Sequence, residues 1–161
     1  GLLRPRRGRV RWAAPLRGLP GYRRAGMLFQ QPRHQALLER VEDEVAYGPE
    51  NLGRERAEVE PLLAAADLLA LRERSPWSLS AGQLQRTALA AAAALAPALL
   101  ILDEPTLGQD EAHLARLMAL AREQCAGGRA ALLITHDEGL VAAVADRVLA
   151  LEGGKVREVA S

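Results

Sequence analysis

The sequence has one cysteine, one lysine and no long uninterrupted apolar run, and each shortage excludes a class of structure. Because a disulfide needs two cysteines, Cys125 excludes an internal disulfide and is consistent with a reducing compartment. The longest apolar run, residues 88–102, is mostly alanine and contains Pro97, whereas a membrane-spanning helix needs roughly 20 apolar residues. The sequence therefore predicts neither a disulfide nor a transmembrane segment.

A glycine-rich phosphate-binding loop is also missing from the 161 residues. Such a loop has the pattern G-x-x-x-x-G-K-[ST], in which backbone N–H groups and one lysine neutralise phosphate charge. The only lysine, Lys155, lies in a C-terminal turn and is followed by Val156. As written, these residues are not expected to bind a nucleotide tightly in a site built on such a loop.

Charge and composition describe a folded domain with no strong attraction to polyanions. Apolar residues make up 49% and charged residues 25% of the chain, which is typical of a globular protein rather than a disordered one. The formal net charge is +1, so we expect no global attraction to nucleic acid or acidic lipid. The arginines between residues 4 and 11 are interpreted as the solvated face of a hairpin, with contact to acidic headgroups as the alternative.

Strands alternate with helices in the second half of the sequence, which indicates an α/β fold with a mainly parallel sheet. We expect core strands at residues 27–29, 98–102 and 130–135. The second should be buried on both faces, as parallel strands are, and the third should also be buried. A closing hairpin is expected at 147–159. The first expected helix covers residues 34–47 and ends at Gly48-Pro49. The second covers 54–71 and has a break at Pro61. Three more are expected at 80–95, 111–126 and 138–145. Residues 1–26 are expected to form an edge hairpin and a connection. The helical block near residues 32–95 would be inserted into the connectivity of the sheet.

Two adjacent carboxylates, Asp103 and Glu104, follow an apolar strand. Ligands of α/β sheets bind at the carboxyl ends of strands, so both side chains are candidates for a site. The first carboxylate can hold Mg²⁺, and the second can align a water molecule and accept its proton. Taken alone, the pair could instead cap the next turn.

A second candidate is the helix start at Ser80, with Gln83 three residues later. The first N–H groups of a helix are free and carry partial positive charge, so they bind phosphate without a lysine. Gly82 allows close approach of the backbone, and Ser80 and Gln83 add side-chain hydrogen bonds. An ordinary capping box would explain Ser80 and Gln83 equally well.

Five elements follow one another in the sequence in a recognisable order. They are Gln30 after the first core strand, the string Leu79–Arg86 at the start of a helix, Asp103-Glu104 at the end of a strand, Leu107–Asp110 directly after it, and His136 at the end of the next strand. This resembles the order of Q-loop, signature, Walker B, D-loop and H-loop in ATP-binding-cassette (ABC) ATPases. The resemblance covers essentially the whole chain, and it implies an incomplete P-loop NTPase core with an inserted helical subdomain.

A narrower resemblance lies between these motifs. Residues 29–35, and then Gly48-Pro49-Glu50-Asn51-Leu52-Gly53 after a Val-Glu-Asp-Glu helix start at 41–44, resemble the energy-coupling-factor group. These are the ATPases of vitamin importers and of cobalt or nickel importers. In that group this segment lies beside the groove that receives the coupling helices of the membrane subunit.

The resemblance implies catalytic and metal-binding roles for four residues. Gln30 would contact Mg²⁺ or the attacking water, and Asp103 would hold Mg²⁺. Glu104 would polarise the water, and His136 would contact the γ-phosphate of ATP as a switch. Alternatively, His136 has only a structural role, as a histidine at a strand end that bonds to a neighbouring residue.

The resemblance implies nucleotide contacts across a dimer for the helix start. Ser80, Ala81, Gly82 and Gln83 would grip the γ-phosphate held by the opposite subunit of a head-to-tail dimer, and Asp110 would communicate across the interface. Ala81 stands where the signature usually has glycine. Any requirement for positive φ there would produce strain and weaken the phosphate grip.

The resemblance also gives boundaries. Residues 1–5 resemble the segment just after the Walker A helix, so we expect a fragment that begins beyond that helix. We expect residues 1–31 to be a partial N-terminal part of the nucleotide-binding core and 32–95 a helical subdomain that ends in the signature helix. Residues 96–161 would be the RecA-like core with Walker B, D-loop and H-loop.

The leading hypothesis is an ATP-binding and hydrolysing subunit of an energy-coupling-factor importer, located at the cytoplasmic face of the cell membrane. Its expected partners are a second ABC ATPase subunit in a homo- or heterodimer, a transmembrane coupling subunit and a substrate-binding membrane subunit, with no nucleic acid. Two alternatives remain: a non-hydrolysing partner that donates only a signature surface, and a soluble ABC protein of DNA repair or translation. The transported substrate is chosen by a separate membrane subunit in this family.

Overall fold

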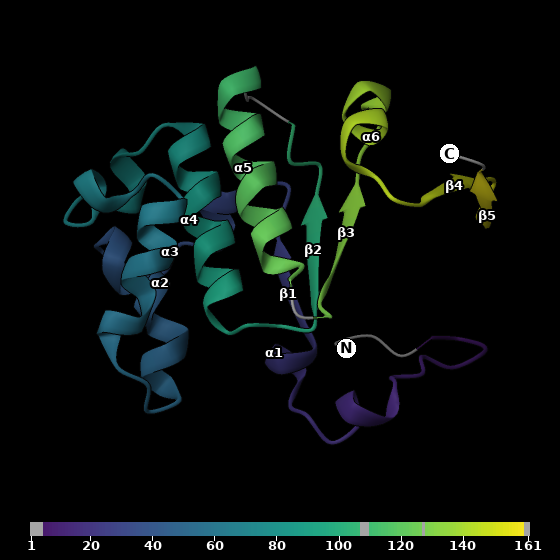
Figure 1. Cartoon of the computed structure of the whole chain (residues 1–161), viewed down its shortest axis with the longest axis horizontal. Helices are drawn as coiled ribbons and strands as arrows, with labels where there is room; N and C mark the ends of the chain where they lie inside the picture. The colour runs from purple at the N-terminus through teal and green to yellow at the C-terminus, as the bar shows by residue number, and fades with distance from the viewer. Residues whose placement is uncertain (1–4, 107–109, 127, 160–161) are drawn as a thin grey trace.

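A three-stranded parallel sheet lies at the centre of the structure. The computed structural model describes residues 5–106, 110–126 and 128–159. The sheet consists of β1 (Ala25–Leu28), β2 (Leu99–Asp103) and β3 (Ala130–Ile134), in the order β1-β2-β3. Figure 1 shows β2 and β3 side by side with both arrowheads at the top. The predicted α/β fold with a mainly parallel sheet is confirmed.

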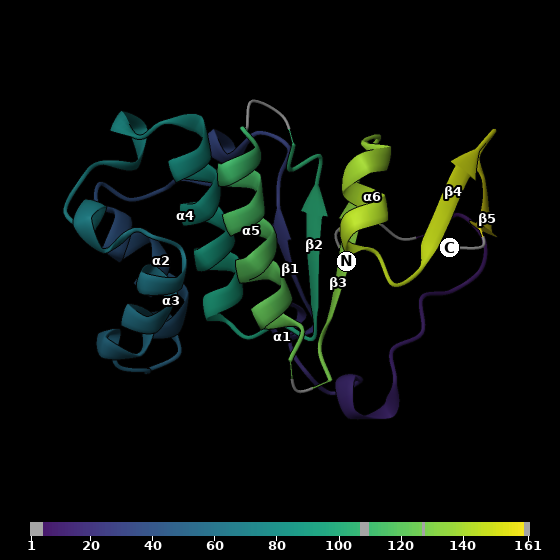
Figure 2. The ribbon, with the colours of Figure 1, turned by 45° about the horizontal axis from the view of Figure 1, so that its top comes forward.

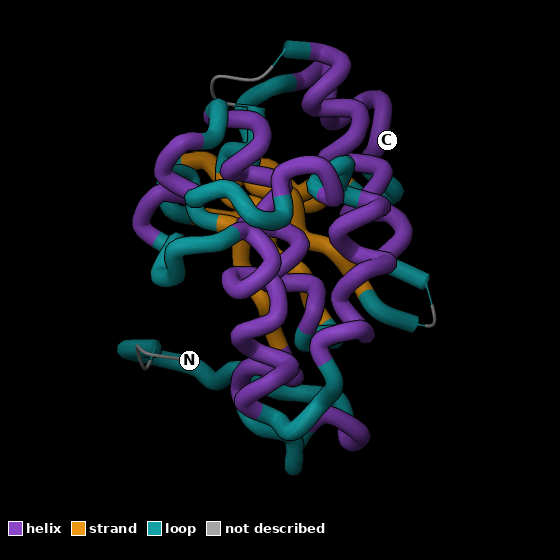
Figure 3. The backbone as a smooth tube through the Cα atoms, turned by 90° about the vertical axis from the view of Figure 1, so that its left-hand side faces the viewer, coloured by secondary structure: helices purple, strands orange, loops and turns teal. Residues whose placement is uncertain are grey.

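Two long helices cover one face of this sheet. Helix α4 (Ala81–Ala94) contacts β1 and helix α5 (Glu111–Gln124) contacts β3, and Figure 3 shows helices in front of the strands. Helix α6 (Glu138–Val144) lies beside α5, where Arg122 Nη2 donates to the carbonyl of Ala143 at 3.2 Å. The core contains fully buried leucines from the strands and helices, among them Leu28, Leu63, Leu89, Leu100, Leu102, Leu117 and Leu120.

A helical block is inserted between β1 and β2, as expected. Helix α2 (Val41–Asn51) packs against α4, and helix α3 (Glu60–Ala65) also contacts α4. Single 3₁₀ turns connect these helices, at Pro32–His34, Arg56–Val59, Leu69–Leu71 and Pro76–Ser78. In Figure 2 the block lies at the opposite end of the molecule from the hairpin β4–β5. None of the helices in the described part of the chain is long and apolar enough to cross a membrane.

The closing hairpin is confirmed as a separate antiparallel pair, β4 (Val148–Glu152) and β5 (Lys155–Val159). The expected burial of the strands, by contrast, is wrong. In β2 only Leu100 and Leu102 are buried, and the other three residues are half-buried. In β3 most residues are exposed. Successive side chains of a strand face opposite sides of the sheet, and the described elements cover only one of these sides well.

Helix boundaries in the inserted block also differ from expectation. Helix α2 begins at Val41 rather than at residue 34, and it continues through Gly48 and Pro49 to Asn51. A Cβ on Gly48 would lie 2.8 Å from Leu95 Cδ2, so glycine lets α2 approach the end of α4 closely. The Asn51 side chain donates to the carbonyl of Tyr47 at 2.8 Å and so stabilises the turn that contains the proline.

Prolines begin helical turns elsewhere in the chain. Pro61 lies in the first turn of α3 and does not break a longer helix, because its missing N–H has no intrahelical partner at that position. Within residues 5–26 the expected edge hairpin is absent. A 3₁₀ turn at Ala14–Leu16 contains Pro15, and Pro20 is the N-cap of the short helix α1 (Gly21–Arg24).

Candidate functional site

The ends of the three parallel strands bring the predicted catalytic residues to one edge of the sheet. Leu28 in β1 is paired with Leu102 in β2, and Asp103 is paired with Ile134 in β3. The segments that follow the strands therefore leave the sheet at the same edge, at the top of Figure 1. These segments carry the residues predicted from the sequence, which are Gln30, Asp103, Glu104 and His136.

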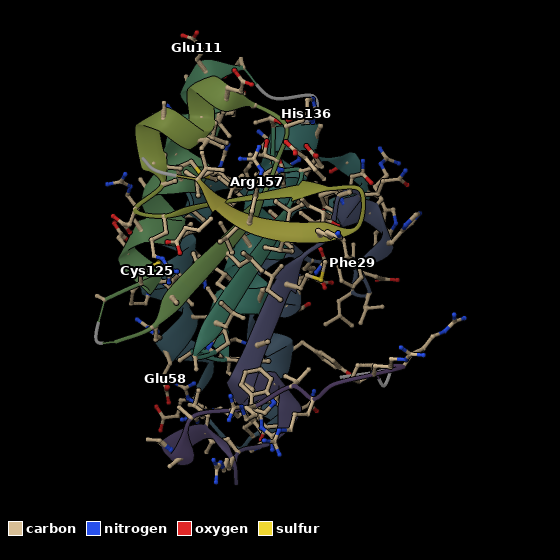
Figure 4. The ribbon with its side chains drawn as sticks, turned by 90° about the vertical axis from the view of Figure 1, so that its right-hand side faces the viewer. Phe29, Glu58, Glu111, Cys125, His136 and Arg157 are labelled. Atoms are coloured by element: carbon tan, nitrogen blue, oxygen red, sulfur yellow. The ribbon has the colours of Figure 1, made fainter. Side chains whose placement is uncertain are left out.

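Glu104 and His136 are in direct contact. The Glu104 Oε2 and His136 Nδ1 atoms are 2.9 Å apart, and Figure 4 labels His136 near the upper edge of the molecule. The Glu104 side chain is 21% exposed and the His136 side chain is 76% exposed. A water molecule or an anion can therefore reach the imidazole while the carboxylate is held in a more protected position.

The backbone at Glu104 is in the left-handed region. Its φ is +49°, and its N–H donates to the carbonyl of Ile134 at 2.8 Å. A non-glycine residue in this region costs on the order of 1–3 kcal/mol, and such residues cluster at functional sites. The β3 strand thus helps to hold Glu104 in a conformation that turns its carboxylate toward His136.

The pairing raises the pKa of His136 above its ordinary value, because the imidazolium donates a hydrogen bond to the Glu104 carboxylate and is attracted to its charge. We expect Glu104→Gln to lower the pKa of His136 toward 6.5, the ordinary value. The stabilisation from the pair should be complete below that ordinary value and should disappear as the pH rises through the raised pKa. Proton NMR titration of the imidazole measures the change, and the His136 signal is assigned by its absence in His136→Gln. A pKa of His136 that is the same in Glu104→Gln as in the wild type would contradict the pairing.

The residues predicted to bind phosphate begin helix α4. Ser80 Oγ accepts from the N–H of Gln83 at 3.3 Å, and Gln83 Oε1 accepts from the N–H of Ser80 at 3.0 Å. The predicted capping box is thus confirmed. The first intrahelical bond is donated by Leu84, so the N–H groups of Ala81 and Gly82 have no partner within the helix and can bind an anion. Ala81 is not among the residues with positive φ, so the anticipated strain is absent.

Asp110 is the N-cap of helix α5. Its Oδ1 accepts from the N–H of His113 at 2.8 Å, and its Oδ2 lies 2.6 Å from His113 Nδ1. The two hydrogen bonds lower the pKa of Asp110. The other residues of the predicted D-loop, 107–109, lie outside the described residues.

Asp103 and Gln30 are the candidate Mg²⁺ ligands. Asp103 ends β2 and is half-buried, and Gln30 is exposed in the segment after β1. No group of three or more His, Cys, Asp or Glu residues in the described ranges could hold a metal ion. A carboxylate and an amide oxygen nevertheless fit Mg²⁺, which prefers oxygen ligands and usually keeps several waters and substrate phosphates.

Gln35, which the sequence reasoning did not single out, shapes the segment that contains Gln30. Its Nε2 donates to the carbonyl of Met27 at 2.8 Å, and its Oε1 accepts from the N–H of Phe29 at 2.7 Å. The amide thereby continues the hydrogen bonding of β1 and fixes the start of the turn. A pocket of about 210 Å³ adjoins it, lined by residues of β1, of the following turn and of α4, among them Gly26, Met27, Pro32, Leu84, Thr87 and Leu95.

Two buried polar residues of α4 were also missed. Gln85 Nε2 donates to the carbonyl of Pro105 at 3.1 Å, and Arg86 Nε donates to the carbonyl of Ala66 at 2.7 Å. Each residue is only 2% exposed. Their position within an otherwise alanine-rich helix was the available signal.

A parallel sheet with two carboxylates and a histidine at its carboxyl edge, together with a capped helix N-terminus, is typical of α/β nucleotide-binding domains. The ABC transporter sequence profile matches residues 1–107. The chain belongs to the ABC transporter family of ATP-binding domains.

Relatives and solved structures support this assignment. The cobalt import ATP-binding protein CbiO of Rhodobacter capsulatus is 39% identical to this chain over 166 residues, which are 97% of this chain. The energy-coupling factor transporter ATP-binding protein EcfA1 of Symbiobacterium thermophilum is 43% identical over 143 residues, which are 84% of this chain and 49% of the relative. CbiO1 from Clostridium perfringens, part of the transporter complex CbiONQ, matches with a TM-score of 0.74 and 30% identity, over 83% of this chain and 55% of that chain. The chain spans 27%, 64% and 59% of the lengths of relatives from Methanosarcina acetivorans, Pyrococcus furiosus and Rhodobacter capsulatus.

Proposed function

We propose that the protein containing this chain binds ATP with Mg²⁺ and hydrolyses it as the ATP-binding subunit of an energy-coupling-factor importer. The observation that carries the proposal is the contact between Glu104 and His136 at the carboxyl edge of the sheet. A positioned carboxylate can accept a proton from water, and phosphoryl transfer depends mainly on such positioning and on charge neutralisation. Relatives named as cobalt import and energy-coupling-factor ATP-binding proteins support the choice of transporter.

Glu104 is the general base of the proposed reaction. As the water oxygen forms a bond to the γ-phosphorus and the bond to the leaving ADP oxygen breaks, Glu104 accepts the proton of the water. His136 orients this carboxylate through Nδ1. The exposed part of its imidazole would contact the γ-phosphate of a bound ATP. Mg²⁺ held by Asp103 and Gln30 would neutralise charge on the phosphates.

The start of α4 is proposed to bind the γ-phosphate carried by a second subunit, identical or paralogous. The free N–H groups of Ala81 and Gly82 are suited to an anion, and Ser80 and Gln83 lie beside them. Asp110 would lie at the same interface. A dimeric ATP-binding cassette, MJ0796 bound to ADP and phosphate, matches the fold with a TM-score of 0.73 and 25% identity.

The turn after β1 and the inserted block are proposed to receive a membrane subunit at the cytoplasmic face of the membrane. Phe29 and Leu37 are 43% and 66% exposed beside Gln35, which lines the pocket. A membrane subunit that covered these two side chains would remove apolar surface from water, which is favourable. In this proposal residues 1–31 and 96–161 form the nucleotide-binding core and residues 32–95 form the subdomain that contacts the membrane subunit.

Co-purification tests this proposal. The tagged gene product that contains this chain, extracted in mild detergent from its own cells, should recover a membrane-spanning subunit. Leu37→Asp should reduce that recovery about tenfold, since it places a charge in the proposed contact, whereas Leu69→Asp, at a residue that is 40% exposed elsewhere in the block, should not. Recovery of DNA or ribosomes in place of a membrane subunit would favour a repair or translation factor.

A further inference from the structure

The buried side chain of Gln85 joins helix α4 to the turn after β2. The residue is 2% exposed, and its Nε2 donates to the carbonyl of Pro105, 20 positions along the chain, at 3.1 Å. Its Oε1 is buried without a hydrogen-bond partner among the residues that the structure describes. An apolar side chain of similar size would fill the space without leaving that oxygen unpaired, so packing alone does not explain an amide at this position.

Pro105 directly follows Glu104, so the contact acts on the same turn that carries the proposed general base. On one side the N–H of Glu104 donates to Ile134 in β3, and on the other side Gln85 binds the carbonyl of Pro105. The proline is buried, and its ring limits its own φ. The left-handed backbone of Glu104 is thus fixed between a strand and a helix, and the carboxylate contacts His136 from that position.

We infer that Gln85 is a positioning residue for Glu104: its amide holds the Pro105 carbonyl and thereby keeps the Glu104 carboxylate in reach of His136 and of the attacking water. The inference rests on the proposed role of Glu104 as the general base. It also links the two ends of the site, since Gln85 lies on the helix whose first turn is proposed to bind phosphate. Displacement of α4 would be transmitted to Glu104 through this hydrogen bond.

The test replaces Gln85 by Met, which has similar length and no donor, and by Leu as a second variant in the same gene product. Leu89→Met is the matched control, because Leu89 lies on the same helix, is 0% exposed, and has no polar side-chain atom, so this substitution changes packing alone. Steady-state kinetics give kcat and KM for Mg-ATP, and proton NMR gives the titration of His136.

In the Gln85 variants we expect kcat to fall about 10–100-fold while KM stays within about twofold of wild type, as for a misplaced catalytic group. We also expect the pKa of His136 to move toward its ordinary value. The control should retain both values. A kcat and a His136 titration equal to those of the control would overturn the inference, even where the variants are less stable. If the wild-type protein hydrolyses no ATP, the proposed function fails, and the His136 titration alone then decides whether Gln85 positions Glu104.

Discussion

Glu104→Gln should reduce the kcat for ATP hydrolysis by about 10²–10⁴-fold while nucleotide affinity changes little, because the amide cannot accept the proton of the attacking water. The substitution keeps the size of the side chain and its place between β2 and β3, including the backbone bond to Ile134. The experiment uses the whole gene product that contains this chain and compares phosphate release with equilibrium binding of ATP.

The neighbouring carboxylate provides the comparison for this result. Asp103→Asn should weaken Mg-ATP binding as well as hydrolysis, because Asp103 is proposed to hold the metal rather than to accept a proton. Turnover of Glu104→Gln within about threefold of wild type would remove Glu104 from the role of general base, because such a base contributes at least about 10²-fold.

Ser80→Asp should abolish productive contact between two subunits, whereas Ser80→Asn should leave most of it. Both residues are good N-caps, so each preserves the start of α4. Only the aspartate places a negative charge where the phosphate of the second subunit is proposed to bind. Two like charges about 4 Å apart repel by about 4 kcal/mol at an effective dielectric constant of about 20, which corresponds to a loss of roughly 100-fold or more in ATP-dependent dimer formation.

Size-exclusion chromatography in the presence of ATP measures this effect. Each substitution is made in a protein variant that binds ATP but does not hydrolyse it. Equal dimer formation by the Asp and Asn variants would show that no phosphate lies at the helix start. Loss of dimer in both variants would instead show that the Ser80 hydroxyl itself is required.

The sequence was sufficient to predict the elements that follow strong local rules. The capping box at Ser80, the strand that ends at Asp103 and the closing hairpin each depend on residues close together in the chain. The order of parallel strands then places the residues that follow them at one edge, so the meeting of Glu104 and His136 could be anticipated.

Features that depend on distant parts of the chain were not predictable. Helix α2 passes through Gly48-Pro49, and there it lies so close to Leu95, nearly fifty positions later, that a Cβ on Gly48 would be 2.8 Å from Leu95 Cδ2. The exposure of β3 depends on which elements cover the second face of the sheet. The contact of Gln85 with Pro105 depends on how α4 packs beside β2, for which the spacing of apolar residues gives no signal.

Phosphate release by the purified gene product, measured with Mg-ATP in the presence and absence of an intact homologous ABC ATPase subunit, tests the central claim most directly. The account predicts Mg²⁺-dependent release by the wild-type protein, alone or paired with the homologous subunit, and a large reduction of that release in Glu104→Gln. Release only when the homologous subunit is added, unchanged by Glu104→Gln, would contradict the account and would identify a partner that donates its α4 surface to another enzyme's site.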